Sequence, residues 1–159
     1  MKIGVLSDIH DNIDNLNVAV EILKKRGIEV VFVLGDLICP NVAKILGDNF
    51  SGYCIRGNND GDIVGIQTKL GKNIKFFPNT YAIVEFENKS FFMTHYDDLA
   101  STVNPSHFDF VFYGHNHTKF SKNINDCLIL NPGEIGHMRN KPSFAIVDLD
   151  TKEYEFIDL

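Results

Sequence analysis

Short apolar runs that each end in a polar cluster are the feature that most constrains how this chain folds. Residues 2–7 are followed by Asp8-Ile9-His10, and the β-branched run Val30–Leu34 is followed by Gly35-Asp36. Continuous apolar runs of about four to eight residues are typical of strands that are buried on both faces. In parallel sheets of this kind, ligands bind at the carboxyl ends of the strands. The polar clusters are therefore candidates for one shared site.

A helix is predicted between the first two strands, from Asn12 to Lys25. Its apolar residues recur at three- and four-residue steps, which is the spacing of one helix face, and Gly27 is typical of a helix C-terminus. A short helix at 41–47 and a strand at 52–55 continue the alternation. Strands that alternate with helices form right-handed crossovers and a parallel sheet.

The second half of the chain is richer in predicted strands. Residues 81–94 read as a hairpin around Asn88-Lys89, 110–113 form another apolar run, and 143–159 read as a hairpin around Thr151-Lys152. These strands are predicted to form a second, mixed sheet. No linker or repeat divides the chain, so residues 1–159 are expected to be a single domain. The predicted fold class is α/β, a two-sheet sandwich with helices outside.

Composition limits the function classes. Fifteen Lys and Arg residues stand against 21 Asp and Glu residues, so the net charge is −6 and no basic footprint supports bulk nucleic-acid binding. A role at phosphates would need a local positive charge such as a metal ion. Three cysteines without a CxxC pair indicate a reducing compartment, so we expect a cytoplasmic protein. No apolar run reaches the roughly 18 residues that a membrane span needs.

The polar clusters carry residue types that bind divalent metals. Four of the six histidines lie in these clusters, in a D-x-H pattern at Asp8 and His10 and an H-x-H pattern at His115 and His117. Residues two apart in an extended backbone point to the same side, so each pair can reach one ion. Carboxylate, imidazole and amide oxygen together suit Mn²⁺, Fe, Ni²⁺ or Zn²⁺. A dinuclear site is the natural inference.

The order of the clusters, D-x-H, G-D, G-N-x-D, H and G-H-x-H, resembles the motif set of the calcineurin-like metallophosphoesterase superfamily. The short chain and the later Asn131-Pro132-Gly133 are similar to its small prokaryotic phosphodiesterase group. The resemblance implies two divalent ions, with manganese expected first, and a hydroxide between them that attacks phosphorus. One ion would be held by Asp8, His10 and His117, and the other by Asn58, His95 and His115, with Asp36 bridging the two.

One position departs from the family pattern. Many members have histidine where this chain has Asn59, and an amide cannot deliver a proton to a leaving group near neutral pH. We therefore expect a preference for leaving groups of low pKa. The resemblance implies that Asn59 and His95 surround the charge that develops on the phosphate, and that Asp60 holds a ligand from behind.

Two alternatives stay open at this stage. The retromer subunit of the same fold is a protein-binding module, and phosphomonoesters or dinucleotide polyphosphates could replace a small phosphodiester as substrate. A homo-oligomer is also open, because dimers are the commonest soluble assemblies.

Arg139 is a candidate for the rim of the site, whereas His107 and His137 have no ligand spacing. Glu134 stands where similar proteins often have serine.

Overall fold

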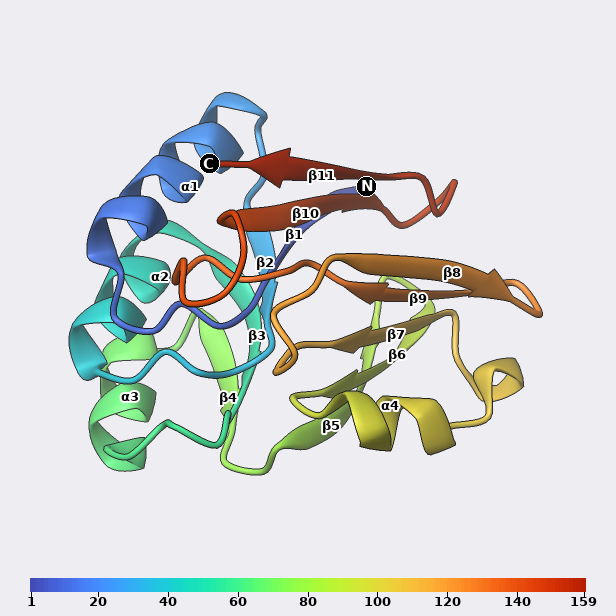
Figure 1. Ribbon diagram of the computed structural model, residues 1–159, viewed down its shortest axis with the longest axis horizontal. Helices are drawn as coiled ribbons and strands as arrows, with labels where there is room; N and C mark the ends of the chain where they lie inside the picture. The colour runs from blue at the N-terminus through green and yellow to red at the C-terminus, as the bar shows by residue number, and fades with distance from the viewer.

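The computed structural model describes residues 1–159 and arranges them in two β-sheets with helices on the outside (Figure 1). The helices are α1 (Ile13–Lys25), α2 (Pro40–Asn49), α3 (Ile63–Leu70) and α4 (Asp97–Thr102), with a 3-10 turn η1 (Pro105–His107). The first sheet contains β1 (Lys2–Leu6), β2 (Val30–Val33), β3 (Ser51–Ile55), β4 (Ile74–Phe77), β10 (Ser143–Asp148) and β11 (Tyr154–Asp158). The second contains β5 (Tyr81–Phe86), β6 (Lys89–Thr94), β7 (Phe110–Tyr113), β8 (Phe120–Ile124) and β9 (Cys127–Asn131).

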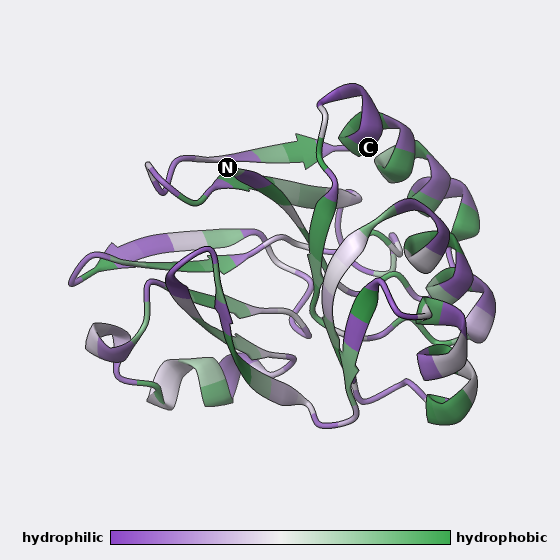
Figure 2. Ribbon diagram, turned by 180° about the vertical axis from the view of Figure 1, so that it is seen from behind, coloured by the Kyte–Doolittle hydropathy of each residue, from purple (hydrophilic) through white to green (hydrophobic).

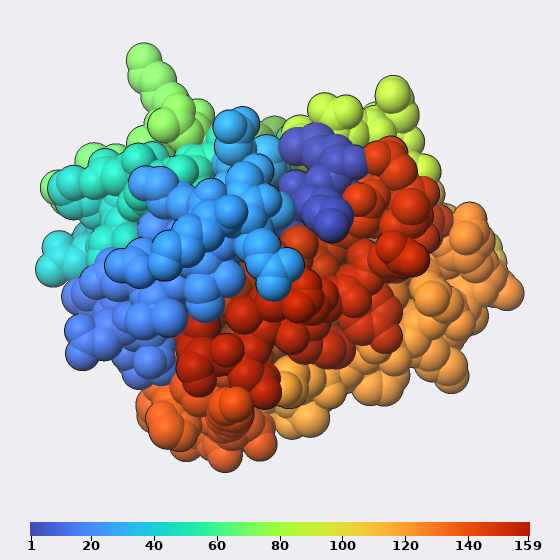
Figure 3. Space-filling view, turned by 90° about the horizontal axis from the view of Figure 1, so that it is seen from above, coloured from blue at the N-terminus to red at the C-terminus, as the bar shows by residue number.

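The first sheet has the strand order β11-β10-β1-β2-β3-β4, and β1 to β4 are parallel as predicted. The prediction that the 143–159 hairpin joins the second sheet is wrong, because β10 pairs antiparallel with β1 in the first. In Figure 3 the C-terminal part of the chain, in red, lies beside the N-terminal end, in dark blue. The physical reason lies in the two faces of β10. Phe144 and Ile146 pack under the helices, whereas Ala145 and Val147 pack between the sheets. Such a strand is stable only in a sheet that is covered on both sides.

The second sheet has the order β5-β6-β7-β9-β8. Its β8–β9 hairpin turns at Asn125-Asp126, where both residues have positive φ, 50° and 66°. The sequence analysis did not predict this hairpin, nor α3 and β4. Strand β8 is largely exposed and carries little apolar pattern, which explains the omission.

Three apolar layers hold the sandwich together. A cluster of 21 buried residues fills the space between α1–α3 and the first sheet, 17 lie between the two sheets, and five lie beneath α4. Phe91, Phe110 and Phe112 are fully buried between the sheets, as predicted for core aromatics. Figure 2 shows the apolar stretches along the strands and the polar loops at their ends. The predicted α/β two-sheet sandwich is confirmed.

The topology also decides where the polar clusters meet. Parallel pairing aligns the carboxyl ends of β1, β2 and β3, and the parallel pair β6–β7 does the same in the second sheet. Loops from the two sheets then converge at one edge of the sandwich.

None of the helices combines the length and the apolar character needed to cross a bilayer.

Candidate metal centre

Three predicted ligands converge on one point at this edge. The Nε2 atoms of His10 and His117 are 3.3 Å apart, and Asp8 Oδ1 lies 3.7 Å from the first and 3.4 Å from the second. Nitrogen and oxygen atoms that share one cation at about 2.0–2.2 Å have separations of this size. Asp8 and His10 follow a strand of the first sheet and His117 follows a strand of the second, so loops from both sheets form one potential ion site.

Asp8 provides the test of whether these residues fit a cation. Its side chain is fully buried, and Oδ2 accepts hydrogen bonds from the hydroxyl of Ser7 (2.6 Å) and the backbone N–H of His115 (3.0 Å). The other oxygen, Oδ1, has no hydrogen-bond partner. A buried carboxylate oxygen without a partner is costly, and a divalent cation would satisfy it. The residues at this site fit a metal ion.

A second group of ligand atoms lies beside the first. Asp36 Oδ2 is 3.6 Å from His10 Nε2 and 3.5 Å from His95 Nε2, so it stands between the two groups. Asn58 Oδ1 lies 2.9 Å from His95 Nε2. Carboxylate and imidazole atoms of Asp8, Asp36 and His95 all lie within 4.8 Å of one another. The ring of His115 is 5.1 Å from that of His95, but His115 belongs to neither close group.

Hydrogen bonds from behind orient two of the imidazoles. The Nδ1–H of His95 donates to the carbonyl of Leu34 at 2.7 Å, and the Nδ1–H of His117 donates to Glu134 Oε2 at 2.8 Å. A donor at Nδ1 leaves Nε2 with its lone pair toward the candidate ion position. This arrangement is common for metal-binding histidines.

The backbone at the site is strained and closely packed. Five of the predicted ligands have left-handed φ angles between 47° and 67°: Asp8, His10, Asp36, His115 and His117. Such angles cost a residue with a side chain about 1–2 kcal/mol. A Cβ added at Gly57 would lie 2.1 Å from Asp36 Oδ1, so only glycine lets these two loops approach so closely. Strain of this kind is typical of functional sites.

Asn59 and Asp60 both act on Asp36. The backbone N–H and side-chain amide of Asn59 donate to the two oxygens of Asp36, at 2.8 and 2.7 Å. Asp60, which is 1% exposed, accepts backbone N–H bonds from Asp36, Ile38 and Gly57 at 3.0, 2.8 and 2.7 Å. The G-N-x-D loop is thereby tied to the G-D loop.

The electrostatics of the site favour positive charge at its centre. Burial raises the pKa of Asp36, but the nearby imidazole of His95 and hydrogen bonds from Asn59 lower it to about 2. The nearby carboxylate of Asp8 raises the pKa of His10. Burial lowers the pKa of His95, yet Asp36 outweighs this effect, so the net shift is upward. Ionised carboxylates therefore surround the point where the imidazole nitrogens meet.

An open cleft of about 610 Å³ lies over these groups. Its walls combine predicted ligands with a mixed rim: His10, Asp36, Ile38, Asn58, Asn59, His115, His117, Met138 and Arg139. Arg139 is among these residues, and His137 is exposed outside the two ligand groups. The sequence analysis did not include Ile38 and Met138, because a lone apolar loop residue carries no chemical signal.

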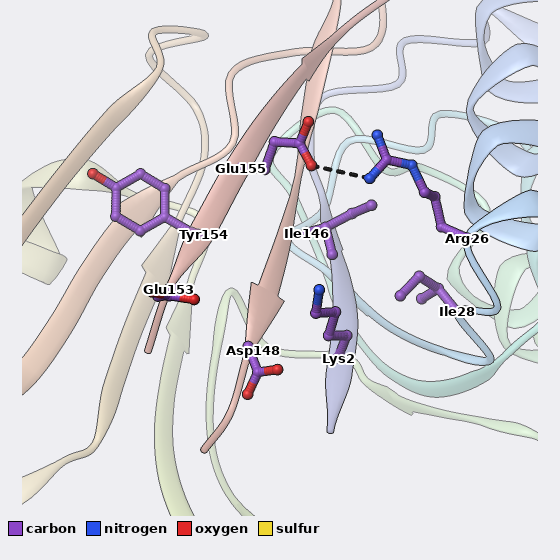
Figure 4. Close-up of a pocket in the computed structure, with 8 residues that line it drawn as sticks. All are labelled: Lys2, Arg26, Ile28, Ile146, Asp148, Glu153, Tyr154 and Glu155. Atoms are coloured by element: carbon purple, nitrogen blue, oxygen red, sulfur yellow. Dashed lines mark hydrogen bonds and ion pairs between the residues drawn. The ribbon is translucent and has the colours of Figure 1, made fainter. Parts of the chain in front are cut away.

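A second, smaller cavity of about 190 Å³ lies away from this site. It opens near the start of β1, at Lys2, and is crossed by an ion pair of 3.2 Å between Arg26 and Glu155 (Figure 4). Its lining contains no histidine or cysteine. Both groups of potential metal ligands lie instead at the carboxyl edge of the strands.

Comparison with known proteins agrees with this geometry. Residues 1–152 match the calcineurin-like phosphoesterase superfamily domain. A phosphodiesterase of Methanocaldococcus jannaschii is 33% identical over 100% of this chain and 99% of its own. A solved archaeal phosphodiesterase superposes with a TM-score of 0.90 at 32% identity, and both chains are fully covered.

More distant structures share the fold alone. The phosphoesterase YfcE of E. coli has a TM-score of 0.72 at 20% identity, with 99% of both chains covered. Vps29 of Entamoeba histolytica has a TM-score of 0.71 at 17% identity, covering 100% of this chain and 99% of its own. From the family match, the archaeal relatives and the converging ligand loops, we conclude that this chain belongs to the calcineurin-like phosphoesterase superfamily.

Proposed function

We propose that this protein is a metal-dependent phosphodiesterase with a dinuclear centre. The observation that carries the proposal is the position of Asp36, whose Oδ2 lies 3.6 Å from one predicted ligand, His10, and 3.5 Å from another, His95. A carboxylate between two groups of ligand atoms is suited to bridge two cations. The phosphodiesterase of M. jannaschii, at 33% identity over the whole chain, supports the reaction class.

The ligand assignment follows the close group of side chains for one ion and the family resemblance for the other, because His115 lies in neither close group. One ion would be held by Asp8, His10 and His117, the other by Asn58, His95 and His115, with Asp36 shared. Two divalent cations held by these residues would supply a water of lowered pKa as the nucleophile for phosphorus and would neutralise charge on the phosphate oxygens. The donor set suits manganese first, with nickel, iron or zinc as alternatives.

The chain's own residues would position these groups and the substrate. Asn59 and Asp60 hold the Asp36 loop, and Leu34 and Glu134 fix two imidazoles. Arg139 stands at the rim of the cleft, where a cation can bind a phosphodiester oxygen that does not react. No imidazole occupies position 59, so proton delivery to the leaving group is weak. Esters with leaving groups of low pKa are therefore the expected substrates.

The experiment is hydrolysis of bis-p-nitrophenyl phosphate by metal-stripped protein, with and without added Mn²⁺. We expect turnover that depends on the metal, that the Asp36→Asn variant loses, and that exceeds turnover of p-nitrophenyl phosphate. Asp62→Asn is the matched control, because Asp62 is exposed and caps α3 outside the site. Faster hydrolysis of the monoester would contradict the diester assignment.

Stoichiometric Mn²⁺ binding without any turnover would favour the other reading, a protein-binding module of the same fold. A single domain over residues 1–159, a cytoplasmic location, the absence of bulk nucleic-acid binding and a homo-oligomer stay predictions. Gel filtration with light scattering tests the last of these directly.

A further inference from the structure

Glu134 is a fully buried carboxylate that lies behind the candidate metal centre. Its Oε2 accepts hydrogen bonds from His117 Nδ1–H at 2.8 Å and from the backbone N–H of Met138 at 2.7 Å. Its Oε1 accepts from the backbone N–H groups of Arg139, at 2.7 Å, and of Asn140. An ionised carboxylate has about four lone-pair sites, and all four are filled here. Every one of these partners donates and none accepts a hydrogen bond, so the NH₂ group of a neutral amide would have no acceptor here.

The two sides of this carboxylate serve different parts of the site. One side contacts a predicted metal ligand, His117. The other side contacts the loop of residues 136–140, which places Met138 and Arg139 on the rim of the cleft. The same loop is tied to the first ligand loop, because Gly136 N–H donates to the carbonyl of Asp8 at 2.8 Å. Glu134 is therefore a buried carboxylate that contacts both a predicted ligand and the rim loop.

We propose that Glu134 is a positioning residue that couples the metal centre to the substrate rim. It keeps His117 in the tautomer whose Nε2 faces the ion, and it folds the 136–140 loop so that Arg139 reaches the cleft. The inference deepens the proposed function and rests on it. It concerns the binding of the metal and of the substrate, not the transfer of a proton.

Replacing Glu134 by glutamine tests these two roles while the size of the side chain stays the same. The amide has one oxygen, and that oxygen is best placed toward Arg139 and Asn140, where two backbone N–H groups converge. Its NH₂ group then faces His117 Nδ1, which must become an acceptor, so the ring proton moves to Nε2. A protonated Nε2 cannot bind a cation. A wrong tautomer of this kind is the reason that an amide substitution behind a histidine can disable a site of intact geometry.

The first test is Mn²⁺ binding to metal-stripped protein by calorimetry, without substrate. We expect Glu134→Gln to bind Mn²⁺ about 10–100-fold more weakly than wild type, as for other groups that orient a metal-binding histidine. Glu153→Gln, an exposed glutamate on the β10–β11 turn, should bind as wild type does. Unchanged binding by Glu134→Gln would overturn the inference and leave the proposed function intact. Absence of binding by wild type itself would overturn both.

The second test separates kcat from KM on bis-p-nitrophenyl phosphate at saturating Mn²⁺. Arg139→Ala should raise KM with little change in Mn²⁺ affinity, whereas Glu134→Gln should raise KM and weaken Mn²⁺ binding together. A Glu134→Gln variant with the KM of wild type would refute the coupling to the rim.

If Glu134→Gln fails to fold, the wild-type protein still decides the question. Nitrogen-15 NMR of the metal-free protein at alkaline pH reports which ring nitrogen of His117 carries the proton. We expect the proton on Nδ1. A proton on Nε2 would overturn the inference.

Discussion

Replacing Asp60 by asparagine should destabilise the protein far more than its single-atom change suggests. The carboxylate is 1% exposed and accepts three backbone N–H groups, with Oδ2 bound to Asp36 and Gly57 and Oδ1 bound to Ile38. Asparagine has one acceptor oxygen. If that oxygen keeps the two bonds to Asp36 and Gly57, the NH₂ group faces the N–H of Ile38, and a donor meets a donor.

The magnitude follows from these contacts. A buried donor left without a partner costs about 1–3 kcal/mol, and each of the two surviving bonds loses about 1 kcal/mol when its acceptor becomes neutral. The loss of unfolding free energy is therefore about 3–5 kcal/mol. Domains have a total stability of about 5–15 kcal/mol, so a large share is at stake.

The assay is urea unfolding of the metal-free protein, followed by circular dichroism. Asp62→Asn is the matched control, because Asp62 accepts one exposed backbone N–H, from Gly65 at 2.9 Å, and asparagine caps helices equally well. We expect a change below about 0.5 kcal/mol for this control. A loss of less than about 1 kcal/mol for Asp60→Asn would refute the claim that the carboxylate joins the two loops.

Three further predictions concern proton transfer, the metal site and pH. Asn59→His should introduce a proton donor and raise the rate for alkyl relative to aryl phosphodiesters, within the roughly 10²–10⁴-fold range of general-acid catalysis. An alkyl-to-aryl rate ratio equal to that of wild type would contradict this prediction. Gly57→Ala should abolish Mn²⁺ binding in calorimetry, because its Cβ would lie 2.1 Å from Asp36 Oδ1. Burial raises the pKa of Asp109, but hydrogen bonds from Ser90 outweigh this and hold it below the ordinary value of an aspartate. The ionised Asp109 thus stabilises the protein above the pKa of the unfolded chain, and its contribution is lost as pH falls through the folded pKa. In urea titrations at several pH values, Asp109→Asn should lose less unfolding free energy on acidification than wild type.

Local pattern was sufficient for much of the fold. The apolar runs that end in polar clusters identified β1, β2 and β3, and the three- and four-residue spacing identified α1. Each of these elements is determined by its own side chains, because a strand or helix shows its buried face in its residue spacing. Apolar runs of this kind located all nine predicted site residues in loops that follow strands, since polar groups cluster where a buried strand ends.

The sheet that each strand joins was beyond the reach of local pattern. Residues 143–159 read correctly as a hairpin, but the apolar faces of β10 show only that it is buried, not that β1 is its neighbour. Strand β8 is exposed, so its contribution to the second sheet depends on β9 and not on its own residues. Pairing between strands far apart in sequence is a property of the whole chain.

The chemical roles divide in the same way. The sequence by itself determined which residue types could hold a metal, because carboxylate, imidazole and amide groups are identified without a fold. The extended backbone expected for the D-x-H and H-x-H pairs is wrong, since all four of their Asp and His residues have left-handed φ. Only the tertiary structure decided that Asp8 Oδ1 lacks a partner, that Asn59 points at Asp36, and that Glu134 stands behind His117. A buried carboxylate acts through the donors that surround it. Those donors come from segments that meet only when the two sheets pack together.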